Sequence, residues 1–160
     1  MLVMGREPVR AYARCGADKG PDFVLPGSAK DPVPFLSYTS NAYLGRMVEL
    51  LMADAKTPLF LDTCYETDMA EGLKMMALEG RGIAFLPESA VLRDVKYKHL
   101  ARADGGAPGW EIELEIRLYR ERPNGQRPGK AIVESLWQYL VQQQQSPTRS
   151  SRRRRSPAAC

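Results

Sequence analysis

The segment over residues 69–87 constrains the fold more strongly than any other part of this 160-residue chain. Four apolar side chains recur at helical spacing and predict the buried face of a helix: Met69, Leu73, Met76 and Ala77. Gly80 stands where helices often end on a left-handed residue, and residues 82–86 form an apolar run typical of a strand buried on both faces of a parallel sheet. A helix that joins two such strands is a βαβ unit, so the segment predicts an α/β fold.

The rest of the chain supplies the other elements of such a fold. We expect strands at residues 1–16 (one or two, with a break at Gly5), 35–36 and 59–61, and helices at about residues 42–54 and 88–92. Thr67 with Asp68 offers an N-cap and a first-turn acid for the helix that contains Met69. Residues 110–118 alternate apolar and polar side chains and predict a strand with one buried face, and residues 132–140 predict a helix with one apolar face.

Charge and composition limit the classes of partner. The net charge of +4 comes from the tail, where residues 149–155 contain five arginines, so the body is close to neutral and suits a small molecule or a protein better than a nucleic-acid backbone. No apolar run has the length of a membrane span, and the start lacks the features of a secretory signal. Cys15, Cys64 and Cys160 are an odd number without metal-ligand spacing. We therefore expect reduced thiols, a cytoplasmic location and no membrane partner.

Residues with catalytic or metal-binding chemistry are sparse. His99 is the only histidine, no Cys or His pair has ligand spacing, and no Gly-rich phosphate loop precedes a helix, so we expect no metal, no cofactor and no catalytic residue. Cys64 with His99 as its base is the one plausible nucleophilic pair. A lone cysteine beside an apolar strand is more often a small buried side chain, so the sequence favours a protein that is not an enzyme.

Polar helix starts are more informative. Thr39, Ser40 and Asn41 precede one predicted helix and Thr67 precedes the next, and hydroxyls with exposed N–H groups at such positions can bind an anion or a polar ligand. Helix capping alone is the alternative explanation. Because ligands of open α/β sheets lie beyond the carboxyl ends of the strands, the two starts could converge on one cleft.

Methionines form a third group of candidates. Met69, Met75 and Met76 cluster on one predicted helix. Oxidation of a thioether to a sulfoxide makes an apolar side chain polar and can act as a reversible switch. Flexible filling of a hydrophobic core is the alternative role for the same residues.

The order of these elements resembles the effector-binding domain of LysR-type transcription regulators over about residues 1–143. The stretches that carry the resemblance are Phe35-Leu36-Ser37-Tyr38, Asn41-Ala42-Tyr43-Leu44-Gly45-Arg46, residues 69–78 and Gly80-Arg81-Gly82-Ile83-Ala84-Phe85-Leu86-Pro87. The set also resembles the subgroup that responds to hypochlorite through methionine oxidation, including Tyr119-Arg120 and the helix around Trp137. The resemblance implies a periplasmic-binding-protein-like (type 2) α/β fold of two lobes, with a small-molecule effector or oxidant bound between them, and a homo-oligomer, either a dimer or a tetramer.

On this resemblance the chain holds one complete lobe and a returning strand and helix of the other. Residues 1–7 would be the crossover strand from lobe I, residues 8–103 lobe II, residues 104–144 the return into lobe I, and residues 145–160 a disordered Arg-rich tail. The winged helix-turn-helix that binds DNA would precede Met1. The chain is therefore expected to be part of a longer regulator and to meet DNA only through that missing domain.

The resemblance also assigns ligand-binding residues. The candidates are Thr39, Ser40, Asn41, Thr67, Met69, Ile83 and Phe85. The first three match the polar helix start that faces the cleft, and the last two match the strand edge behind it. Met69 matches a methionine of the hypochlorite-responsive pattern and is the redox candidate, whereas Leu44 stands where that subgroup has another methionine.

Three hypotheses for the function follow. The leading one is the effector- or oxidant-sensing portion of a LysR-type regulator that alters transcription. The second is a free-standing small-molecule-binding or Cys64-dependent α/β enzyme. The third is a nucleic-acid-binding protein that acts through its Arg-rich tail.

Overall fold

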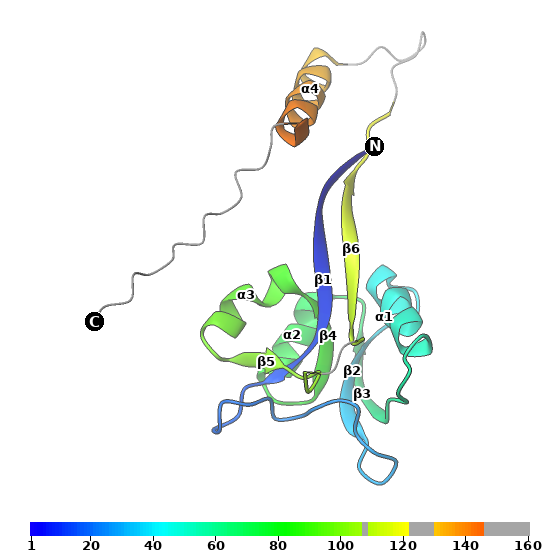
Figure 1. The fold of residues 1–160 in the computed structure, drawn as a ribbon, viewed down its shortest axis with the longest axis vertical. Helices are drawn as coiled ribbons and strands as arrows, with labels where there is room; N and C mark the ends of the chain where they lie inside the picture. The colour runs from blue at the N-terminus through cyan, green and yellow to red at the C-terminus, as the bar shows by residue number, and fades with distance from the viewer. Residues whose placement is uncertain (107–108, 122–129, 146–160) are drawn as a thin grey trace, which may run out of the picture. The chain divides into compact units, whose positions relative to one another are not determined.

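The computed structural model describes residues 1–106, 109–121 and 130–145, in which strands and helices alternate from β2 to β5 (Figure 1). The elements are β1 (Leu2–Arg14), β2 (Val33–Tyr38), α1 (Tyr43–Ala53), β3 (Leu61–Thr67), α2 (Ala70–Leu78), β4 (Ile83–Pro87), α3 (Glu88–Lys96), β5 (Leu100–Arg102), β6 (Glu111–Leu118) and α4 (Ala131–Gln145). The predicted break at Gly5 is wrong, because β1 runs through it, and α3 extends beyond the predicted residue 92. From residue 146 onward the predicted tail lies outside the described residues.

The sheet has β4 at its centre. Its strand order is β3-β2-β4-β1-β5, and β6 pairs with β1 beside this path. β2 is parallel to β3 and to β4, whereas β1 is antiparallel to β4 and β5. The helix-linked parallel strands confirm the predicted α/β fold. The sheet is nevertheless mixed rather than parallel, because β1 adds to β4 in the opposite direction.

The end of α2 follows the prediction and its start does not. Gly80 has φ of 75°, its N–H donates to the Ala77 carbonyl at 2.9 Å, and the Arg81 N–H donates to the Met76 carbonyl at 3.1 Å, which together form a Schellman end. At the other end the helix begins at Ala70, so Met69 lies before the first turn in extended backbone and its side chain is 62% exposed. The expectation that Met69 belongs to the buried face is therefore wrong.

The strand before α2 also differs from its prediction. β3 begins at Leu61, where the predicted strand 59–61 ends, and pairs in parallel with β2 as far as Tyr38 and Thr67. It forms one end of the strand order, and its residues 62–66 are exposed. An edge strand can carry polar side chains, so apolar runs do not reveal it. Because β3 extends to Thr67, the predicted N-cap role of Thr67 is wrong and Met69 occupies that position.

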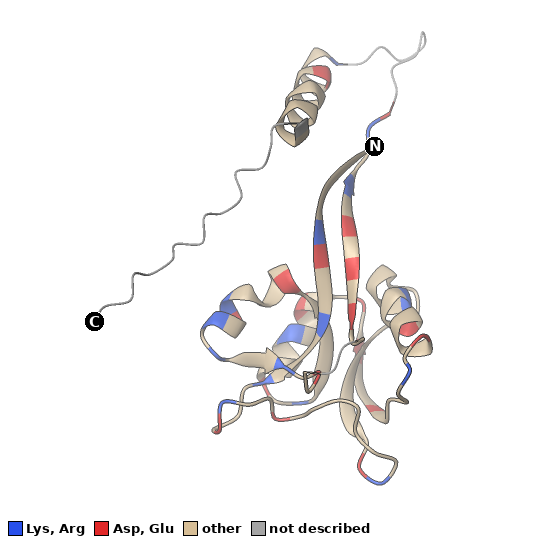
Figure 2. Ribbon diagram, in the orientation of Figure 1, with Lys and Arg blue, Asp and Glu red and all other residues tan. Residues whose placement is uncertain are grey.

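Ion pairs fasten the first half of β6 to β1. Figure 2 shows the acidic positions of β6 beside the strand β1, which carries basic positions. Arg6 Nη1 lies 3.1 Å from Glu113 Oε1, and Arg10 Nε lies 2.7 Å from Glu111 Oε2. Arg10 Nη1 also reaches Glu88 Oε1 at 2.6 Å. Hydrogen bonding to Glu111 raises the pKa of Arg10 above its ordinary value. The glutamates on the charged face of β6 therefore hold this strand to β1 and also face water.

The chain divides into two compact units. The larger unit is Arg6–Glu115, and the smaller unit combines Met1–Gly5 with Ile116–Cys160. Every buried apolar residue of the described core, from Val9 to Trp110, belongs to the larger unit. This unit therefore has a hydrophobic core of its own. The lobe assignment of residues 1–7, 8–103 and 104–144 stays a prediction.

The smaller unit exposes apolar side chains of β6 and α4. Along the alternation Trp110 is 5% exposed, but Ile116 is 50% and Leu118 37% exposed. On α4, Ile132 is 74% and Leu136 57% exposed. The predicted single buried face of β6 is thus wrong beyond its first half. Among the residues that the structure describes, no helix is long and apolar enough to cross a membrane.

Candidate functional site

The carboxyl ends of β2 and β3 bring two of the predicted ligand-binding segments together. The strands pair in parallel as far as Tyr38 and Thr67, and the Thr39 N–H then donates to the Thr67 carbonyl at 3.0 Å. Residues 39–41 and 67–69 therefore lie side by side. After them α1 begins at Tyr43 and α2 at Ala70. We call these two segments the paired helix starts. Their position beyond adjacent strand ends is where open α/β sheets bind ligands.

Neither helix of this pair is capped by a side chain. The N-cap of α1 is Ala42, that of α2 is Met69, and neither position makes a side-chain capping hydrogen bond. First-turn N–H groups without such a cap carry partial positive charge and can receive an anion. Ser40 and Asn41 are exposed at the start of α1, and Thr39 is half-buried.

The start of α1 suits an anion better than the start of α2. The first turn of α1 contains no acidic residue, whereas that of α2 contains Glu71, which pairs with Lys74 Nζ at 2.5 Å. Asp68 stands next to the same turn. Their carboxylates repel an anion from the α2 side. At the α2 start Thr67 Oγ1 accepts a hydrogen bond from the Met69 N–H at 3.4 Å, so this hydroxyl oxygen already has a partner within the protein.

Gly45 allows α1 to pack directly on the end of β2, a role that the sequence analysis missed. A Cβ atom at this position would lie 2.5 Å from the Thr39 carbonyl oxygen and 3.1 Å from Tyr38 Cβ. The third residue of α2, Gly72, is less crowded, because its nearest neighbour would be the Thr67 Cγ2 methyl at 3.3 Å. A glycine within a predicted helix could have signalled close packing, although not its partner.

Tyr38, the last residue of β2, has a buried hydroxyl group that the sequence did not point to. It is 4% exposed, and its hydroxyl has no hydrogen-bond partner among the residues described. Burial raises the pKa of the Tyr38 phenol above its ordinary value. Its position directly before Thr39 places a buried tyrosine beneath the start of the candidate site.

Ile83 and Phe85 are buried in the core and are not exposed at the surface of the paired helix starts. They are 0% and 1% exposed, and the Phe85 ring meets the Phe35 ring edge-on at 6.2 Å between centroids. The expected position at a strand edge is wrong, because β4 is flanked by β2 and β1. Their contact with a ligand stays a prediction.

The residues of the alternative catalytic pair are separated. Cys64 lies on β3 and His99 directly precedes β5, at opposite ends of the strand order. Cys64 is exposed, so the expectation of a buried thiol is wrong, and its Sγ lies 3.5 Å from the Phe35 carbonyl oxygen. His99 Nδ1 lies 3.7 Å from Asp94 Oδ1. Within the described parts of the chain, no group of three or more His, Cys, Asp or Glu residues could hold a metal ion.

Comparison with known proteins gives a family model and two curated relatives. The model of the LysR substrate binding domain matches residues 25–145. The HTH domain-truncated transcriptional regulator QseD of Escherichia coli O157:H7 is 30% identical over 107 residues, which are 67% of this chain and 41% of that protein. The HTH-type transcriptional regulator YjiE of Escherichia coli K12 is 30% identical over 112 residues, 70% of this chain and 35% of that protein. The chain thus spans well under half the length of either relative.

Among solved structures, full-length HypT of Salmonella typhimurium, a hypochlorite-specific LysR-type transcriptional regulator, superposes with a TM-score of 0.70. The identity is 22%, and the match covers 90% of this chain and 46% of that chain. At this identity the likeness concerns the fold, which is the periplasmic-binding-protein-like type 2 fold of LysR regulatory domains.

Proposed function

Because the chain belongs to the family of LysR substrate-binding domains, we propose that it is the effector-sensing part of a LysR-type transcription regulator. Regulators of this family bind small-molecule effectors, form oligomers and contact DNA through an N-terminal domain. The observation that carries the proposal is the hydrogen bond from Thr39 N–H to the Thr67 carbonyl, which joins two helix starts at adjacent strand ends. The effector binds at these paired helix starts.

The chemistry of the site favours an anionic or polar effector held mainly by α1. The first-turn N–H groups of α1 attract negative charge, and the exposed side chains of Ser40 and Asn41 add hydrogen-bonding groups. Such a ligand regulates transcription only if it binds two conformations of the regulator with different affinity. We propose that the carboxylate or other anionic group of the effector approaches α1 and that its remainder contacts the residues of the α2 start.

A bromide titration tests the anion site at α1. In a chloride-free buffer of constant ionic strength, backbone amide NMR signals of residues 41–44 are expected to shift and saturate. The start of α3 is a matched control, because its Ser89 N–H is already bonded to the Glu7 carboxylate at 2.8 Å and should respond little. The Asn41→Asp variant adds a negative charge of similar shape and should weaken binding at least about fivefold.

Equal shifts at α1 and α3, or unchanged bromide binding in Asn41→Asp, would contradict an anion site at α1. The regulatory part of the proposal has a separate test in cells. Replacement of the gene by its Asn41→Asp variant is expected to change the transcript levels of a defined set of genes. An unchanged transcript profile, with bromide binding lost, would separate ligand binding from control of transcription.

Oxidant sensing through Met69 is a second candidate function. Met69 is 62% exposed, stands at the N-cap of α2 within the paired helix starts, and belongs to a chain whose fold resembles that of the hypochlorite-specific HypT. The proposed step is transfer of the oxygen atom of hypochlorous acid to the thioether sulfur. The sulfur is oxidised to a sulfoxide, and the chlorine leaves as chloride with a proton.

Mild hypochlorite treatment followed by peptide mass spectrometry should therefore find sulfoxide at Met69 at least about fivefold faster than at Met75. Met75 is the matched control because it lies on α2, the helix that Met69 precedes, and is 53% exposed. Exposure alone predicts nearly equal rates for the two side chains. A rate ratio close to one would thus count against a specialised oxidation site at Met69.

A further inference from the structure

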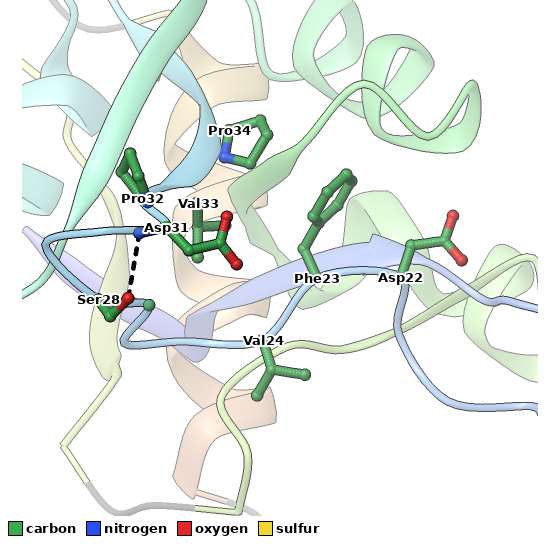
Figure 3. A pocket seen from close by; sticks show the side chains of 9 residues that line it. Asp22, Phe23, Val24, Ser28, Asp31, Pro32, Val33 and Pro34 are labelled. Carbon is green, nitrogen blue, oxygen red and sulfur yellow. Dashed lines mark hydrogen bonds between the residues drawn. The ribbon is translucent and has the colours of Figure 1, made fainter.

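A pocket lies at the opposite end of β2 from the paired helix starts (Figure 3). Its lining residues are Asp22, Phe23, Val24, Gly27, Ser28, Asp31, Pro32, Val33 and Pro34. The cavity volume is about 460 Å³, within the range of small-molecule sites. All of these residues belong to the larger unit. None of the predicted ligand-binding residues lines this pocket, so the effector site does not account for it.

The walls of the pocket are fixed by backbone hydrogen bonds to distant parts of the chain. The Leu25 N–H donates to the Ala103 carbonyl at 2.8 Å, and the Phe60 N–H donates to the Pro26 carbonyl at 2.9 Å. The Val33 N–H completes the frame by donating to the Phe60 carbonyl at 2.8 Å. A loop held at several points keeps its shape before a ligand arrives, which lowers the entropy cost of binding.

The charge in the pocket is negative and only partly compensated. Among the described residues that line the pocket are the carboxylates of Asp22 and Asp31 but no Lys or Arg. Asp22 Oδ2 pairs with Arg14 Nε at 2.7 Å. Asp31, by contrast, uses its backbone N–H for Ser28 Oγ at 3.1 Å, and its carboxylate makes no ion pair in the described part of the chain. Figure 3 shows this carboxylate directed toward the Phe23 ring.

This combination selects a class of ligand. A negative pocket repels anions, and one unpaired carboxylate is too few donors for a metal site. The apolar side chains of Phe23, Val24 and Val33 can cover an aliphatic or aromatic body, and the free carboxylate can receive an ammonium group. We propose that the pocket is a second ligand site, which binds a small organic cation with its ammonium group at Asp31 and its apolar body against Phe23.

Phenethylammonium tests this site, with 2-phenylethanol as an uncharged probe of similar shape. Phenethylammonium is expected to shift the backbone amide NMR signals of Ser28, Asp31 and Val33 with saturation, and 2-phenylethanol to bind them at least about fivefold more weakly. Asp31→Asn should weaken phenethylammonium binding by about fivefold as well. The variant should keep its fold, because Asp31 holds the turn with its backbone N–H and carbonyl groups, which the substitution leaves in place.

Glu49→Gln is the matched control, since it removes an exposed carboxylate of α1 that does not line the pocket. This variant should bind phenethylammonium as the unmodified chain does. Equal binding of both probes, equal loss in both variants, or shifts spread over the surface without saturation would overturn the proposed site. Bromide binding at α1 is measured separately and does not depend on any of these outcomes.

Discussion

Truncation of Phe85 to alanine is expected to lower the free energy of unfolding by about 4 kcal/mol. The ring is 1% exposed on the central strand β4 and packs edge-on against Phe35, with 76° between the ring planes. The variant loses buried apolar area and an aromatic pair. It also leaves a cavity that cannot readily collapse, because β2 and β1 hold β4 from both sides. Urea denaturation followed by circular dichroism measures the loss.

Phe85→Leu separates a packing role from a ligand contact. Leucine fills most of the cavity, so the expected loss of stability is only about 1 kcal/mol. If the ring also contacts a ligand, this folded variant should lose ligand affinity, which settles the role that the family resemblance assigns to Phe85. A cost below about 1 kcal/mol for the alanine variant would show that the ring is not packed as the structure has it.

Gly45→Ala is expected to lower the free energy of unfolding by about 2 kcal/mol and to abolish the bromide response of α1. Alanine gains about 1 kcal/mol in helix propensity over glycine. Its Cβ, however, would lie 2.5 Å from the Thr39 carbonyl oxygen, a backbone atom that can move only with the strand end. The overpacking costs about 3 kcal/mol and pushes α1 away from β2. Thermal unfolding and the bromide titration measure the two effects.

Gly72→Ala is the corresponding change in α2, and its effect should be neutral or stabilising by up to about 1 kcal/mol. Gly72 is the third residue of its helix, as Gly45 is of α1. A Cβ at Gly72 would meet only the Thr67 side chain, which can adjust. Equal effects of the two substitutions would show that helix propensity, and not the contact with Thr39, decides the stability at Gly45.

Elements that depend on local patterns were predictable from the sequence. The helix expected at residues 42–54 is observed as Tyr43–Ala53, and the buried run after Gly80 is observed as β4. Helical periodicity identifies the first element, and a glycine followed by continuous apolar residues identifies the second. Each pattern lies within a dozen positions of the sequence. The Schellman end of α2 belongs to the same class, because its geometry depends on Gly80 itself.

Elements that depend on distant partners were not predictable in the same way. β3 is a strand because β2 pairs with it, and its exposed side chains carry no strand periodicity. Met69 is exposed because α2 begins one residue later than the apolar spacing suggests. The alternation that ends at Leu118 predicts a buried face, but burial requires a covering element, which the sequence of one strand cannot specify.

The candidate site also combines features that the local sequence predicts with features that depend on distant residues. Thr39, Ser40 and Asn41 could be identified from residue type and position before a helix. Their approach to Thr67 rests on a hydrogen bond between residues far apart in the sequence, as does the close contact of Gly45 with Thr39. The pocket near Asp31 depends on three such distant backbone bonds and had no sequence signal.

The larger unit is one continuous segment whose two ends meet. Arg6 and Glu115 mark its limits, and Arg6 Nη2 lies 3.5 Å from Glu115 Oε1. A segment with adjoining ends and its own core can be transplanted into a surface loop of a host protein without stretching either chain. We therefore expect residues 6–115 to fold as a cassette when they are inserted into such a loop.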